Sequence, residues 1–252
     1  MISKKIKTSL FLSIMLLFIS AMFVLFANTI SLADENEPQP ITTRAELEAA
    51  FSNGGDYYLE NDIVLNGSEL IFNSPGITVN LDLRDSDLDA EHSSRVLSLL
   101  AGTLVLYSNS TVQPGEMGIG QLKDGNSAKK DDLYCAGGGV YVDGGNLVMN
   151  GGTIAECRSY LSNQNAGDGG CIHLESGSVK INDGQLVSGQ AVRGGGVCVN
   201  GGEFEFNGGL ISNCVANTER YSATDKKSWS AGGGIAIVNP EAKAKMTGGE
   251  IR

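Results

Sequence analysis

Apolar residues alternate with other residues in short runs that recur through the second half of the chain. Four segments superpose on one template that opens with a glycine cluster: residues 137–154, 169–186, 194–211 and 232–251. Within each segment two runs alternate strictly, and glycine pairs separate the runs. A period of two indicates β-strand, and glycine pairs indicate sharp corners. Each segment is therefore expected to fold as short strands joined by tight corners.

The superposed segments share three inward positions. The first is Val140/Val142, Ile172/Leu174, Val197/Val199 and Ile235/Ile237; the second is Leu147/Met149, Val179/Ile181, Phe204/Phe206 and Ala244/Met246; the third is Ile154, Leu186, Ile211 and Ile251. Three short strands per turn of about 22 to 25 residues predict an all-β, right-handed parallel β-helix whose equivalent residues stack about 4.8 Å apart. Residues 58–106 fit the template more loosely, which brings the solenoid to about seven coils.

A short helix is predicted at the start of this domain. Thr43 and Glu46 have the spacing of a capping box, and Leu47, Ala50 and Phe51 follow on one helical face. The helix is expected to cover the first coil, because a solenoid end exposes core and unpaired backbone. At the other end the chain stops in mid-coil, so we expect a truncated or uncapped domain over residues 42–252, with further β-helix coils as partners.

The N-terminus has the pattern of an export signal. Lys4, Lys5 and Lys7 precede an apolar run over residues 11–27, and small residues before Ala33 suit a signal peptidase. We expect a signal peptide over 1–33 and a linker over 34–41. The apolar run is about long enough to span a bilayer, so an uncleaved anchor is the alternative. Either outcome predicts a secreted or cell-surface protein.

The net charge of the chain limits the kinds of partner that it is expected to bind. The chain has a net charge of −11, and removing the three lysines of residues 1–33 leaves 15 basic against 29 acidic residues, a net charge of −14. Nucleic acid is excluded as an expected partner, since phosphate binding needs clustered cations. No cofactor motif is visible. The carboxylates Asp82, Asp85, Asp87 and Asp89 suit calcium or acid-base cleavage of glycans, but the template puts them between core leucines and at a corner, which favours a structural role.

The repeat motifs resemble a known family. Gly-Gly-Gly-Val-Tyr-Val from Gly137, Gly-Gly-Asn-Leu-Val-Met-Asn-Gly-Gly-Thr-Ile from Gly144, and Ile-Thr-Val-Asn-Leu-Asp-Leu from Ile77 look like the pectate-lyase-like right-handed β-helix repeats of large bacterial surface proteins, often called adhesin-like. The glycine-rich openings resemble, less closely, the repeats of chlamydial polymorphic outer-membrane proteins. The resemblance implies fold and surface location, not a reaction. No wall-anchoring or transporter segment is visible, which leaves the mode of attachment open.

Stacking of the repeats converts one polar column into a ladder. Asn150, Asn182 and Asn207 align, and Thr247 continues the column. Asparagine tolerates turn conformations, and its amide can hydrogen-bond the asparagine of the next coil. We expect a structural asparagine ladder at a corner.

Two cysteine hypotheses follow from the same alignment. His173 and Cys198 align in one outward column, the residue types of a nucleophile pair, but no orienting acid is identifiable in the sequence, so a structural role is favoured. Cys135 and Cys157 are 22 residues apart, about one coil, which allows a disulfide between neighbouring coils.

The repeats differ in length at one place, between the third strand and the next glycine cluster. The extra residues are 112–134, 158–166 and 218–230, and insertions at one corner of successive coils build one variable face. Tyr160, Tyr221 and Trp229 lie there among polar residues, as in surfaces that recognise a glycan or a protein, although local packing explains them equally well.

We therefore expect an exported, adhesin-like module without enzymatic activity that presents this face to an extracellular glycan or a host protein. The alternative is a polysaccharide lyase or glycoside hydrolase acting on acidic glycans, which would need a deep groove lined by two or three acids with Lys or Arg nearby. A structural stalk segment, with neither groove nor aromatic patch, is the third hypothesis.

Overall fold

The computed structural model describes residues 37–109, 119–127, 135–159, 167–216 and 231–252. Within it, Pro38–Arg252 form a compact unit, and Met1–Glu37 belong to a separate one. The predicted signal peptide, residues 1–33, lies wholly outside the described residues. No helix within the described ranges is long and apolar enough to span a bilayer.

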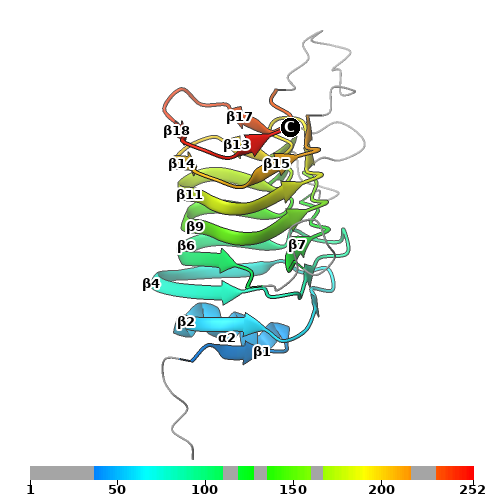
Figure 1. The fold of residues 1–252 in the computed structure, drawn as a ribbon, viewed down its shortest axis with the longest axis vertical. Helices are drawn as coiled ribbons and strands as arrows, with labels where there is room; N and C mark the ends of the chain where they lie inside the picture. The colour runs from blue at the N-terminus through cyan, green and yellow to red at the C-terminus, as the bar shows by residue number, and fades with distance from the viewer. Residues whose placement is uncertain (1–36, 110–118, 128–134, 160–166, 217–230) are drawn as a thin grey trace, which may run out of the picture. The chain divides into compact units, whose positions relative to one another are not determined.

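The compact unit is a large parallel sheet with one helix in its described part (Figure 1). Its elements are β1 (Gln39–Ile41), α2 (Arg44–Asn53), β2 (Gly55–Leu59), β3 (Ile63–Val64), β4 (Leu70–Asp82), β5 (Leu88–Asp89), β6 (Leu97–Tyr107), β7 (Gln121–Lys123), β8 (Cys135–Ala136), β9 (Val140–Ala155), β10 (Gly167–Asp168), β11 (Ile172–Val187), β12 (Gln190–Ala191), β13 (Val197–Val199), β14 (Glu203–Phe206), β15 (Leu210–Ser212), β16 (Val215–Ala216), β17 (Ile235–Ile237), β18 (Lys243–Met246) and β19 (Glu250–Ile251). The main path of the sheet runs β1-β2-β4-β6-β9-β11-β13-β17. An all-β fold with parallel pairing is confirmed and is compatible with a β-helix.

The strand register reproduces the predicted inward columns. Val140, Ile172, Val197 and Ile235 are register partners in turn, and the Leu147 and Ile154 columns follow the same order. The column of His173 and Cys198, which was expected to point outward, is also in register. The inward side chains from β4 to β15 are buried and form one continuous core. Burial of these apolar columns is the main stabilising contribution, at about 25 cal/mol for each Å² removed from water.

The middle strands are longer than the predicted three short strands per turn. β9 and β11 each run for 16 residues, and their register shifts where the chain turns. At these turns the sheet bends through bulges, so backbone pairing continues around the corner. Gly177 illustrates the requirement: it has φ +86°, and a β-carbon there would overlap the carbonyl oxygen of Gly145 on the adjacent strand.

The N-terminal helix forms as predicted. Thr43 is its N-cap, and the capping box with Glu46 is present in both directions. Leu47 and Phe51 are buried, and the Phe51 ring stacks on Phe72 of β4 with centroids 4.7 Å apart. The preceding residues differ from the expected linker, because Gln39–Ile41 form β1 and pair with β2. Ile41 is buried there, which explains why ordered structure begins before residue 42.

The longest predicted insertion is divided by a strand. Within residues 112–134, β7 pairs with β5 on one side and β9 on the other, and Leu122 fills the inward position opposite Ile154. A strand of three residues with one apolar side chain gives too short an alternation to be recognised in sequence.

Candidate functional site

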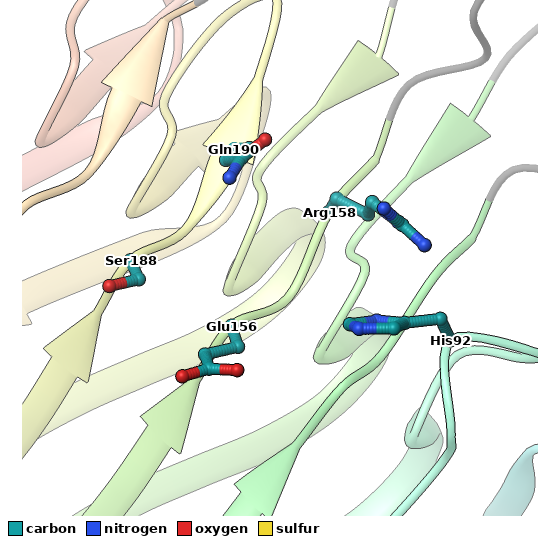
Figure 2. A pocket seen from close by; sticks show the side chains of 5 residues that line it. All are labelled: His92, Glu156, Arg158, Ser188 and Gln190. Carbon is teal, nitrogen blue, oxygen red and sulfur yellow. The ribbon is translucent and has the colours of Figure 1, made fainter.

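A shallow hollow of about 250 Å³ lies where neighbouring turns of the chain leave the sheet. His92, Glu156, Arg158, Ser188 and Gln190 line it, and Figure 2 shows their side chains gathered from adjacent turns, with Arg158 and His92 on the same side. The His92 ring approaches the Asp124 carboxylate at 3.1 Å. The lining is polar and offers one guanidinium, one carboxylate and several neutral hydrogen-bonding groups, a set that suits a hydroxylated ligand.

The backbone of this hollow is in a conformation that recurs at each turn. Glu156 and Ser188 have φ of 55° and 56°, and Asp124 and Asn213 have nearly the same value in their own turns. Positive φ in a non-glycine residue can mark functional strain. Here the repetition indicates a corner of the fold, because the same angle occurs at residues that do not line the hollow.

The sites where the predicted insertions leave the sheet are aligned. Asn126, Arg158 and Gln190 are register partners, and Gln190 pairs with Val215 in turn. On the returning side, Ala136, Asp168, Arg193 and Ala231 align in the same way. Only two residues separate Gln190 from Arg193, so this turn of the chain carries no insertion. It lies between two turns that each carry one. Tyr160, Tyr221 and Trp229 lie outside the described residues.

A second group of ionisable side chains is buried next to β10, where the chain rejoins the sheet. Asp168 of β10 is fully buried, and its two carboxylate oxygens accept hydrogen bonds from Nε and Nη2 of Arg193. A buried carboxylate is costly unless it is paired and hydrogen-bonded, and this bidentate geometry supplies both. Asp168 and Arg193 are register partners, and each stands one residue before a glycine cluster, just outside the segments that the sequence alignment superposed.

His173 of β11 lies beside this pair and is also fully buried, as is Cys198, so the prediction that their column points outward is wrong. Its Nε2 is 3.0 Å from Oε2 of Glu175, and Asn200 donates from Nδ2 to both oxygens of that carboxylate at 2.9 Å. The Tyr141 ring stacks on the imidazole with centroids 5.6 Å apart, and Arg95 lies over Tyr141. The orienting acid that the sequence did not reveal is therefore Glu175, two residues after the histidine.

Burial and hydrogen bonding act in opposite directions on the pKa of His173 and on the pKa of Glu175. Burial lowers the pKa of His173, and the hydrogen bond to Glu175 opposes that shift. For Glu175 burial acts to raise the pKa, but the hydrogen bonds with His173 and Asn200 outweigh it and lower the pKa.

Cys198 completes the group but is poorly suited to nucleophilic attack. It is the register partner of His173 and is fully buried, and burial raises the pKa of its thiol to about 12. A reactive cysteine needs a lowered pKa and access to substrate. One ligand atom each from Asp168, His173 and Cys198 nevertheless lie within 4.8 Å of one another, and carboxylate, imidazole and thiol are the groups that hold transition metals.

The predicted disulfide between Cys135 and Cys157 is not formed. The register places Gly167, 32 residues further on, opposite Cys135, so a separation of 22 residues does not correspond to one turn here. Cys157 is a buried free thiol that donates to the Ala155 carbonyl, and burial raises its pKa to about 12. Repeat length varies through the insertions, which is why sequence spacing misjudged the pairing.

A different pair of thiols is in contact in the core. Sγ of Cys171 lies 2.6 Å from the point where a β-carbon of Gly189 would be, and the next residue, Gln190, is the register partner of Val215, which follows Cys214. Contact with the Cys214 thiol, together with burial, raises the pKa of Cys171. Gly189 leaves the space that this sulfur fills.

The asparagine column is connected by hydrogen bonds. Asn182 donates to Asn150 at 2.8 Å, Asn207 donates to Asn182 at 3.1 Å, and the Thr247 hydroxyl donates to Asn207 at 2.6 Å. Asn150, Asn182 and Thr247 are exposed and Asn207 is half-buried, and the four side chains link successive turns of the sheet.

The candidate aspartates have different partners, because Asp87 and Asp89 both contact Lys123 whereas Asp82 does not. Asp82 is buried and accepts from the backbone of Arg84 and from Asn109, whereas Asp87 forms an ion pair with Lys123 at 2.7 Å. Their carboxylates are therefore engaged in holding corners of the fold.

Comparison of the chain with protein-family models, curated proteins and solved structures finds no match in any of the three.

Proposed function

We propose that this chain is an exported bacterial surface or secreted module, a right-handed pectate-lyase-like β-helix of about seven coils, that binds an extracellular glycan without cleaving it. One observation carries the proposal: the points at which the insertions leave and rejoin the sheet are aligned from turn to turn. Loops that start from aligned positions project from the same side of the sheet, which is how repeat proteins build binding surfaces.

The parallel register supports the solenoid. Inward positions one turn apart pair directly, as in Ile172 with Val197 and Leu186 with Ile211, and the chain advances by one strand spacing with each repeat. Parallel strands need a connection that returns to the same edge of the sheet, and a chain that winds in one direction provides it at every turn.

The polar lining of the hollow favours a glycan over an apolar ligand. Its lining is polar, and Arg158 can form a bidentate hydrogen bond to a sugar carboxylate while Gln190 and Ser188 contact hydroxyl groups. The net charge of the chain is strongly negative, so recognition of an acidic sugar depends on this local guanidinium.

The test is a glycan array probed with the full chain, run beside a cleavage assay on pectate and polygalacturonate. Arg158→Ala removes the guanidinium from the hollow, and Arg252→Ala removes an exposed guanidinium elsewhere as a matched control. A hydrogen bond to a charged group contributes about 1.5 to 3 kcal/mol, so Arg158→Ala is expected to weaken binding about 10- to 100-fold and Arg252→Ala to leave it unchanged.

Each other outcome contradicts a different part of the proposal. Cleavage of either polymer would establish the alternative, a lyase or hydrolase acting on acidic glycans. Capture of a host protein with no glycan bound would replace the ligand class. Equal losses in both arginine variants would remove the hollow from the binding face.

A further inference from the structure

The buried group formed by Asp168, His173 and Cys198 has the composition of a metal site. We propose that it binds one Zn²⁺ ion through an oxygen of Asp168, a ring nitrogen of His173 and Sγ of Cys198. The three ligand atoms lie within 4.8 Å of one another, and all three residues are fully buried. The inference is independent of the proposed glycan function.

The dimensions fit a tetrahedral ion after small side-chain rotations. Zinc lies about 2.0 to 2.3 Å from nitrogen, oxygen and sulfur ligands, which places ligand atoms about 3.3 to 3.8 Å apart. Closing the observed group to that size requires movements of about 1 Å or less at side-chain ends. His173 and Cys198 are already register partners on adjacent strands, β11 and β13, so the backbone fixes two of the three ligands.

The ligand types select zinc over the metals that proteins bind most often through oxygen alone. Thiolate is a soft ligand and favours Zn²⁺, while Ca²⁺ and Mg²⁺ take oxygen ligands almost exclusively. Three protein ligands leave one tetrahedral position for water.

The surrounding hydrogen bonds orient the ligands as they do in zinc proteins. Glu175 holds Nε2 of His173 at 3.0 Å and is itself held by Asn200, so Nδ1 is the ring nitrogen assigned to the metal. A carboxylate on the second ring nitrogen is the usual partner of a metal-ligating histidine. Arg193 donates one hydrogen bond to each oxygen of Asp168, and a carboxylate has further lone pairs for a metal.

The charges balance when the metal enters. With a neutral imidazole and a thiol, Asp168, Glu175 and Arg193 sum to −1. Binding of Zn²⁺ with release of the Cys198 proton to solvent adds two positive charges and one negative charge, so the group becomes neutral. Neutrality favours a site that is removed from water.

The test is titration of the full chain, under reducing conditions, with Co²⁺ as a spectroscopic probe and with Zn²⁺ in competition against a chromophoric chelator. The expected result is one equivalent of metal and a sulfur-to-cobalt charge-transfer band. Cys198→Ser is expected to abolish the band, and Cys157→Ser, which removes a buried free thiol elsewhere, to retain it. Glu175→Gln, at a partly exposed position, is expected to retain the band with affinity lowered about 10- to 100-fold.

Results that overturn the site are distinct from a failure to fold. Circular dichroism of each variant establishes the fold first, and the wild-type titration needs no variant. Absence of the charge-transfer band in the wild type, or its loss in Cys157→Ser with retention in Cys198→Ser, refutes the assignment. An unchanged affinity in Glu175→Gln would contradict the orienting role of the carboxylate.

Discussion

The asparagine column offers a direct measure of how successive turns hold each other. Asn182 is its central member, and it donates to Asn150 at 2.8 Å and accepts from Asn207 at 3.1 Å. Asn182→Leu has nearly the same side-chain size and removes both hydrogen bonds at once. The substitution leaves the inward core untouched, because this column points to solvent.

The expected loss follows from those two contacts. A neutral hydrogen bond contributes about 0.5 to 1.5 kcal/mol net, and exposed bonds fall in the lower half of that range. Two such bonds give about 1 to 2 kcal/mol. For a domain of this size each kcal/mol shifts the melting temperature by about 2 to 4 °C, so a decrease of about 2 to 8 °C is expected.

Thermal and urea denaturation of the wild type and Asn182→Leu measure this difference. Lys180→Ala is the matched control, since it removes an exposed ion pair with Glu205 on the same two turns, and solvent screens such a pair so that it contributes little to stability. A melting temperature of Asn182→Leu equal to that of the wild type, or a larger loss in Lys180→Ala, would refute a stabilising ladder.

Three further predictions concern the corners, the helix and an exposed ion pair. Gly177→Ala is expected to destabilise by about 2 to 4 kcal/mol in urea denaturation, because a β-carbon overlaps a neighbouring carbonyl; Gly76→Ala, at similar φ with open space around it, should cost about 1 kcal/mol. Thr43→Ala removes the N-cap of α2 and is expected to cost about 1 kcal/mol by the same measurement, with a neutral result arguing against the cap. Contact with Lys180 lowers the pKa of Glu205 below its ordinary value of 4.5, so this pair stabilises above that pH and the contribution is lost as pH falls through the folded-state pKa. Glu205→Gln should therefore flatten the pH dependence of stability on the acid side, and identical pH profiles would contradict the pairing.

Local patterns in the sequence determined the repeating part of this fold. The alternation that aligns Val140 with Ile172 and Leu147 with Val179 is a property of a few consecutive residues, and the register reproduces it. The capping box of Thr43 was recognisable for the same reason, since both of its hydrogen bonds join residues three positions apart. These features need no knowledge of distant contacts.

Only the tertiary structure decided how the variable parts return to the sheet. β7 and the true neighbour of Cys135 depend on the length of each insertion, which sequence spacing does not reveal. The register shift after Leu174 likewise places Ser176 opposite Asp143, where a gapless alignment placed Glu175. That shift allows Glu175 to turn toward His173.

The candidate metal site shows the same division. The column of His173 and Cys198 was evident from the repeats, but Asp168 and its partner Arg193 lie one residue before successive glycine clusters, just outside the superposed segments. Burial of all three ligand residues results from contacts between turns. A sequence repeat specifies which residues share a column, whereas the path of the chain between repeats determines which columns meet.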